Sequence, residues 1–226
     1  MRIAQITLAS ADPADQAEFW GERLGLSARD AGSGVEVSLR RSTIRFEPAE
    51  HGVDARYHFA INVPPGSIEA AATWLGERQE LLEFHGDPDV EEGATVVHTD
   101  RGAACLYFLD AGGNVVELIS NPHLDDEADA SFGPESLLEI AEIGVATEDT
   151  AATRAAVQEA FGADVLWGRL LTAIGDDHGV VIVAPAGRGW IPVGLPARPL
   201  PTTIVAEGPR PAEVTLPEGP YVLRAV

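Results

Sequence analysis

The feature that most constrains the fold is one strand-and-helix pattern that occurs three times within 226 residues. Similar strands occur in IAQITLAS from Ile3, RYHFAINV from Arg56 and IAEIGVAT from Ile140, and a helical segment follows each. Two or three strand-like segments of alternating polarity then follow each helix. Repetition of this kind is typical of a fold assembled from one supersecondary unit. The sequence therefore predicts an α+β fold of repeated βαβββ units.

The repeats also predict the domain boundaries. We expect paired units over residues 1–122, with halves of about 1–52 and 56–122. The acidic segment 123–136 contains Gly and Pro and predicts a linker. Residues 137–226 predict a third, divergent unit. Because three units leave one without a mate, an open strand edge would allow a homodimer.

Capping residues mark the ends of two of the predicted helices. Asp12 and Asp149 stand where a side chain can accept hydrogen bonds from the first turn. Gly25 and Gly162 stand where the chain can leave the helix in a left-handed conformation. The pattern therefore predicts helices close to 13–24 and 150–161.

Composition excludes several classes of partner. The chain has 36 acidic residues, 15 basic residues that are all arginine, and a formal net charge of −21. Such a surface repels nucleic acids and anionic membranes. No segment has the apolar length of a membrane span, the start lacks a secretory signal pattern, and the single Cys105 excludes an internal disulfide. We therefore expect a cytoplasmic protein that acts on a small molecule, with no nucleic-acid or membrane partner.

Polar residues occupy repeat-related positions on strands that are otherwise apolar. The first strands carry Gln5 and His58, and the last strands carry Glu47 and Glu117. A buried carboxylate without a partner costs several kcal/mol, and two such carboxylates on one surface repel each other. A divalent cation removes both penalties. The set Gln5, Glu47, His58 and Glu117 therefore predicts a site for Zn, Ni, Co, Mn or Fe.

The third unit has only part of this pattern. Glu142 occupies the position of His58, but Ile182 stands where the second unit has Glu117. One ligand cannot hold a metal ion by itself. The pattern therefore predicts that residues 137–226 are a structural remnant or a partner-recognition element.

The segments YHFAINVP, AEFWGERLGL and LYFLDAGGNVVELIS resemble the vicinal-oxygen-chelate superfamily of glyoxalases, bleomycin-resistance proteins and extradiol dioxygenases. The resemblance implies paired βαβββ units that form a curled mixed sheet with a metal in a central cleft. It places the family's ligand positions on Gln5, His58 and Glu117, with Glu47 as a fourth.

The resemblance also implies a function. We expect a metal-dependent lyase or isomerase of the glyoxalase type, which binds two neighbouring substrate oxygens and stabilises an enediolate or oxyanion. Glu47 or Glu117 would act as general base, with Glu47 preferred, and His98 is a candidate proton shuttle. The alternatives are a non-enzymatic small-molecule or drug-binding protein and an extradiol-type dioxygenase. Gln5 counts against the dioxygenase, because those enzymes usually have histidine there.

Overall fold

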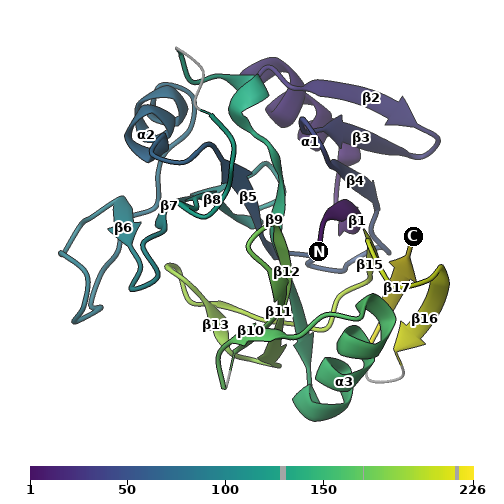
Figure 1. Cartoon of the computed structure of the whole chain (residues 1–226). Helices are drawn as coiled ribbons and strands as arrows, with labels where there is room; N and C mark the ends of the chain where they lie inside the picture. The colour runs from purple at the N-terminus through teal and green to yellow at the C-terminus, as the bar shows by residue number, and fades with distance from the viewer. Residues whose placement is uncertain (128–130, 170, 217–218) are drawn as a thin grey trace.

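Three βαβββ units and a shorter group of strands form the chain in the computed structural model, which describes residues 1–127, 131–169, 171–216 and 219–226 (Figure 1). The first unit consists of β1 (Ile3–Ser10), α1 (Pro13–Ala17) with its π-helical continuation η1 (Glu18–Arg23), β2 (Ser27–Ala31), β3 (Gly34–Ser38) and β4 (Thr43–Pro48). The second consists of β5 (His58–Val63), α2 (Ile68–Gly76), β6 (Val96–His98), β7 (Ala104–Leu109) and β8 (Val115–Ser120). The predicted α+β class and repeated unit are confirmed.

The third unit is complete and is followed by two short strand groups. Its elements are β9 (Glu139–Thr147), α3 (Thr150–Phe161), β10 (Val165–Trp167), β11 (Thr172–Asp176) and β12 (Gly179–Pro185). After it come the hairpin β13 (Gly189–Trp190) and β14 (Leu195–Pro196), then β15 (Thr202–Ala206), β16 (Ala212–Leu216) and β17 (Tyr221–Ala225). The segment predicted as a linker includes the short helix η2 (Pro134–Ser136), and its residues 128–130 lie outside the described residues.

The helix ends form as their sequence predicts. The Asp12 carboxylate accepts a hydrogen bond from the Ala14 amide, and the Asp149 carboxylate accepts from Ala151 and Ala152. Gly162 closes α3 with a φ of 61°, a backbone conformation that residues with a side chain rarely adopt. These local signals are satisfied within one turn of chain, so tertiary packing does not alter them.

The pairing of the units differs from the prediction. Within each unit the first and last strands run parallel, as β1–β4, β5–β8 and β9–β12. Between units, β5 runs antiparallel to β9, and β15 runs antiparallel to β1. The prediction that halves 1–52 and 56–122 pair with each other is therefore wrong for the sheet, because β9 takes the free edge of β5 and β15 takes the free edge of β1.

This arrangement removes the argument for an unmatched unit. The strand group β15–β17 pairs with the first unit through β1, and the third unit pairs with the second through β9. A contact between β1 and β9 joins the two halves into one sheet. The third unit is therefore not left without a mate, and a homodimer stays a prediction. None of the helices in the described residues is long and apolar enough to cross a membrane.

The two faces of β5 have different environments. Phe59, Ile61 and Val63 belong to the main core, together with helix residues such as Trp20 and Leu75. Because side chains alternate along a strand, His58, Ala60 and Asn62 point to the opposite face. That face carries the candidate site.

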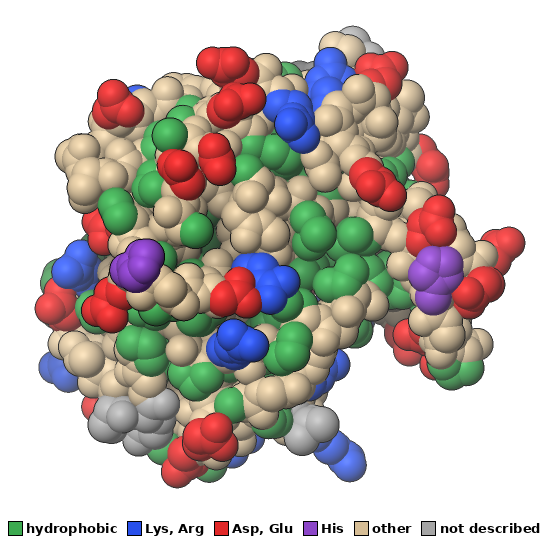
Figure 2. All heavy atoms as spheres, turned by 180° about the vertical axis from the view of Figure 1, so that it is seen from behind, with side chains coloured by type: hydrophobic (Ala, Val, Ile, Leu, Met, Phe, Trp, Pro, Cys, Tyr) green, Lys and Arg blue, Asp and Glu red, His purple; other side chains and the backbone are tan. Residues whose placement is uncertain are grey.

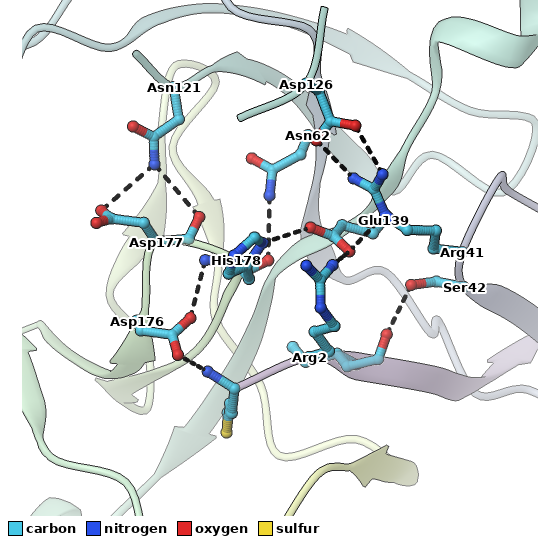
Figure 3. A network of polar contacts seen from close by, with 12 residues as sticks. Arg2, Arg41, Ser42, Asn62, Asn121, Asp126, Glu139, Asp176, Asp177 and His178 are labelled. Atoms are coloured by element: carbon cyan, nitrogen blue, oxygen red, sulfur yellow. Dashed lines mark hydrogen bonds and ion pairs between the residues drawn. The ribbon is translucent and has the colours of Figure 1, made fainter. Parts of the chain in front are cut away.

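A buried carboxylate links the first and third units (Figure 3). The side chain of Glu139 on β9 is 2% exposed and accepts hydrogen bonds from Arg2 at 2.5 Å and Arg41 at 3.0 Å. Its second oxygen lies 3.0 Å from Nδ1 of His178, in the turn between β11 and β12. The Asn62 amide donates to the backbone carbonyl of His178 at 3.1 Å, which connects β5 to the same turn. The buried acid therefore joins β9 to the chain at Arg2, at Arg41 and in the β11–β12 turn.

Candidate metal centre

The turn before β8 fixes the position of Glu117. One oxygen of the buried Asp110 carboxylate accepts from the Gly112 and Asn114 amides, and the other accepts from the Asn114 side chain at 2.7 Å. The side-chain Oδ1 of Asn114 in turn accepts from the Tyr57 amide at 2.8 Å. Gly113 has a φ of 75°, which the turn needs and which a Cβ would disfavour. These bonds fix the start of β8 against β5 and so set the register.

The register brings three side chains around Ala60. On β5, Ala60 lies between Glu117 of β8 on one side and Glu142 of β9 on the other. His58 is two residues from Ala60 and therefore shares its face. Because Ala60 has only a methyl group, the space above it is left to the three polar side chains.

A β-bulge in β9 helps to aim Glu142. Glu142 pairs with Ala60 and Ile140 pairs with Ile61, so Ala141 is an extra residue in the ladder. Glu139, three residues before Glu142, consequently pairs with Asn62 on the same face. Regular alternation would have put the two acids on opposite faces.

The ligand atoms of His58, Glu117 and Glu142 all lie within 4.8 Å of one another. Nε2 of His58 lies 3.7 Å from Glu117 and 3.8 Å from Glu142, which is longer than a hydrogen bond. Nδ1 of His58 lies 3.1 Å from the carbonyl of Val115, so a proton on Nδ1 leaves the Nε2 lone pair directed at the carboxylates. One imidazole and two carboxylates form a donor set that suits a divalent transition metal.

The electrostatics of the three groups fit a cation. Burial and the charge of Glu142 raise the pKa of Glu117 to about 7, although hydrogen bonds from Cys105 and Tyr107 oppose the shift. Burial lowers the pKa of His58, but interaction with Glu142 and the charge of Glu117 outweigh it, so this pKa is raised. Two carboxylates that repel each other in a buried site are relieved by a divalent ion.

The triad of His58, Glu117 and Glu142 lies in the wall of a cavity of about 570 Å³ between the second and third units. Figure 2 shows hydrophobic side chains gathered in the hollow beside a projecting acidic lobe. In Figure 1 that lobe carries β6 and its flanking loops. Most of the lining is apolar, and it includes Phe84, Val97, Leu166, Trp167 and Ile182. A cavity of this size and character suits a small organic ligand.

Trp190 on β13 covers one side of the triad. Its ring lies 5.1 Å from the ring of His58, and Gly144 on β9 leaves the space that the indole fills. A Cβ on Gly144 would come within 2.7 Å of the indole and 3.2 Å of the His58 carbonyl oxygen.

Gly144→Ala is therefore expected to displace Trp190 and to destabilise the fold by about 1–3 kcal/mol, the usual cost of overpacking. Denaturant unfolding measures the stability, and tryptophan fluorescence reports the displacement. Gly76→Ala is the matched control, because a Cβ at Gly76 meets nothing within 4 Å. Equal stability of the two variants would contradict the close packing around Gly144.

Two of the predicted ligands lie elsewhere. Gln5 is on β1 in the other half of the sheet, where its amide donates to Thr7 at 3.2 Å. The Glu47 side chain is 48% exposed and pairs with Arg45 at 2.8 Å. Neither residue lines the cavity, so the structure does not bring them to His58 and Glu117.

Glu47 lies two residues beyond the position on β4 that corresponds to Glu117 on β8. Gln5 pairs with Thr43 as His58 pairs with Val115, so Arg45 occupies the place of Glu117. The predicted match of Ile182 to Glu117 is confirmed. Glu142 pairs with Val180 as His58 pairs with Val115, and Ile182 and Glu117 each lie two residues further on. The third unit was predicted to be a structural remnant or a partner-recognition element, whereas its Glu142 lies with His58 and Glu117 of the second unit in the candidate metal centre.

The signal for Glu142 was present in the sequence, since it stands at the repeat position of His58. The third unit alone offers only this one ligand, so Glu142 becomes part of a candidate site only through the pairing of β9 with β5. His98, the predicted proton shuttle, lines the cavity at the end of β6, and its catalytic role stays a prediction.

Comparisons with known proteins identify the fold. Neither a family model nor a curated protein matches the chain. Among solved structures, a "putative dioxygenase" from Bacillus subtilis covers 92% of this chain and 70% of its own, at 14% identity and a TM-score of 0.60. Glyoxalase I from Zea mays covers 99% of this chain and 92% of its own, at 14% identity and a TM-score of 0.57. Identities this low establish the fold alone: the chain has the vicinal-oxygen-chelate fold.

Proposed function

We propose that this chain is a metal-dependent enzyme that binds a small substrate through two neighbouring oxygens and stabilises an enediolate or a related oxyanion, as a glyoxalase-like lyase or isomerase. The observation that carries the proposal is the buried group of His58, Glu117 and Glu142, whose ligand atoms lie within 4.8 Å of one another beside a cavity. Three protein ligands leave positions open for a substrate.

The three residues would hold Zn, Ni, Co, Mn or Fe, and the ion would supply Lewis-acid stabilisation of negative charge on substrate oxygens. Hydrogen bonding from His58 to Val115 fixes the imidazole orientation. The apolar lining, with Trp190 over His58, excludes water from the reacting atoms and strengthens electrostatic interactions there.

In this proposal, a carboxylate of the triad transfers the proton. Glu142 is the better base, because its side chain is 17% exposed while that of Glu117 is 7% exposed. Glu117 also lies opposite Tyr107 in the β7–β8 ladder, deep in the sheet. Glu47 no longer fits the role of base, since it is exposed and paired with Arg45.

Elemental analysis of protein purified without chelators tests the proposal. We expect about one divalent ion per chain, either as purified or after reconstitution. Turnover of 2-oxoaldehyde hemithioacetals, 2-hydroxy acids and catechols, followed by NMR, would then identify the reaction, with Glu117→Gln as the blank. Failure to bind any divalent ion after reconstitution would overturn the proposal.

The metal affinity should depend on pH. Since the pKa of Glu117 is raised to about 7, a proton competes with the ion below that value. Because the pKa of His58 is raised as well, a second proton competes with the ion, and the affinity should fall by about 10- to 100-fold per pH unit below 7. Calorimetric titration between pH 5.5 and 8 measures this change, and a flat profile would contradict the burial of Glu117 as a metal ligand.

A non-enzymatic binding protein is the second candidate, and the size and apolar lining of the cavity favour it. This alternative predicts that Glu117→Gln leaves the affinity for an apolar ligand unchanged. An extradiol-type dioxygenase would instead require redox-active iron at the triad, so the metal identity discriminates between the enzymatic candidates.

A further inference from the structure

Arg188 is a cationic side chain in the cavity wall without an acidic partner among the described residues. It lies just before β13, lines the cavity and is half-buried. Its Nη1 donates to the carbonyl of the next residue, Gly189, at 3.1 Å. Arg101, which also lines the cavity, instead pairs with Asp177 at 3.4 Å. The cavity therefore contains one guanidinium whose charge the described residues leave uncompensated.

Leaving such a charge uncompensated is unfavourable. Burial lowers the pKa of Arg188, although a guanidinium remains protonated in proteins. The chain has 36 acidic residues against 15 arginines, so a carboxylate partner would be easy to supply. Perturbed groups in a cavity are candidates for ligand binding.

Arg188 faces the same cavity as the candidate metal centre. Trp190 lies against His58, and both Trp190 and Arg188 line the cavity. The position is fixed by hydrogen bonds from the Ala197 amide to Arg188 and from the Gly187 amide to Ala197, each 2.7 Å.

We propose that Arg188 binds a carboxylate of the substrate whose neighbouring oxygens lie at the His58–Glu117–Glu142 site. The substrate class is then a small molecule with two neighbouring oxygens, an apolar middle that contacts residues such as Phe84 and Trp167, and a carboxylate. This inference rests on the proposed function. A guanidinium binds a carboxylate through two parallel hydrogen bonds. Asp100 also lines the cavity, and its negative charge disfavours a doubly charged phosphate more than a singly charged carboxylate.

Matched chelating probes test the inference. Three hydroxamates of equal chain length, which end in a carboxylate, a neutral amide or a phosphonate, are titrated calorimetrically into zinc-loaded protein. In the wild type, the carboxylate probe should bind about 10- to 100-fold more tightly than the amide probe, as expected for a charge-assisted hydrogen bond. Arg188→Met should remove this preference and leave the affinity of the amide probe unchanged. Arg188→Lys should keep part of it, and Arg101→Met should keep all of it.

A second arm separates this inference from the proposed function. Phenylacetate, which has a carboxylate and no chelating group, is titrated into metal-free protein and followed by tryptophan fluorescence. If phenylacetate binds the wild type but not Arg188→Met, the carboxylate site is supported even when no hydroxamate binds. The failure of the hydroxamates would then count only against the metal centre. Equal wild-type affinities for the carboxylate and amide probes, an undiminished preference in Arg188→Met, or tightest binding of the phosphonate would overturn the inference.

Discussion

Glu117→Gln is expected to reduce the affinity for a divalent ion by more than about 100-fold, because changes to groups that only support metal ligands already cost 10- to 100-fold. His58→Ala and Glu142→Gln should have effects of the same order. His58→Ala leaves two of the three donors that lie within 4.8 Å of one another. In the two glutamine variants a neutral amide oxygen replaces a charged carboxylate, which weakens the attraction for the ion. Calorimetric titration of chelator-treated protein measures the loss, and circular dichroism checks that each variant remains folded.

Glu47→Gln and Gln5→Ala are the matched controls. Both residues belong to the ligand set predicted from sequence, and both lie outside the cavity. Their affinities for the ion should equal that of the wild type. If Glu47→Gln loses the ion while Glu142→Gln retains it, the ligand set assigned from the structure is wrong.

The second large effect is expected at Glu139. Glu139→Ala should lower the free energy of unfolding by about 2–4 kcal/mol, because removal of one partner leaves buried donors without compensation. The expected loss of stability is smaller than the largest losses for fully buried ion pairs, because the Arg2 and Arg41 side chains are 40% and 29% exposed. Chemical denaturation followed by fluorescence and by circular dichroism measures this change and tests whether unfolding is two-state.

Glu213→Ala provides the control for an ordinary surface ion pair. Glu213 lies 2.6 Å from Arg224, but the two side chains are 59% and 52% exposed. Its removal should change the stability by less than about 1 kcal/mol. If the two variants lose equal stability, Glu139 does not hold the units together in the way that Figure 3 indicates.

Local signals in the sequence were enough to predict the repeated unit and the helix ends. Asp12, Asp149 and Gly162 act through hydrogen bonds and backbone conformation within one turn, which neighbouring residues determine. His58 and Glu117 were also predicted as neighbours, and they belong to the same unit, where β5 and β8 pair directly. Features that depend on one unit alone were therefore accessible from sequence.

The sequence by itself determined the repeated strand-and-helix units and two of the three residues in the candidate metal centre. Only the tertiary structure decided that β5 pairs with β9, which brings Glu142 to those residues, while Gln5 and Glu47 lie in the other half of the sheet. The physical reason is that every first strand offers a similar free edge, so the choice among partners depends on the whole sheet. The bulge at Ala141 likewise depends on both β5 and β9, because a bulge is an extra residue in one strand relative to its partner.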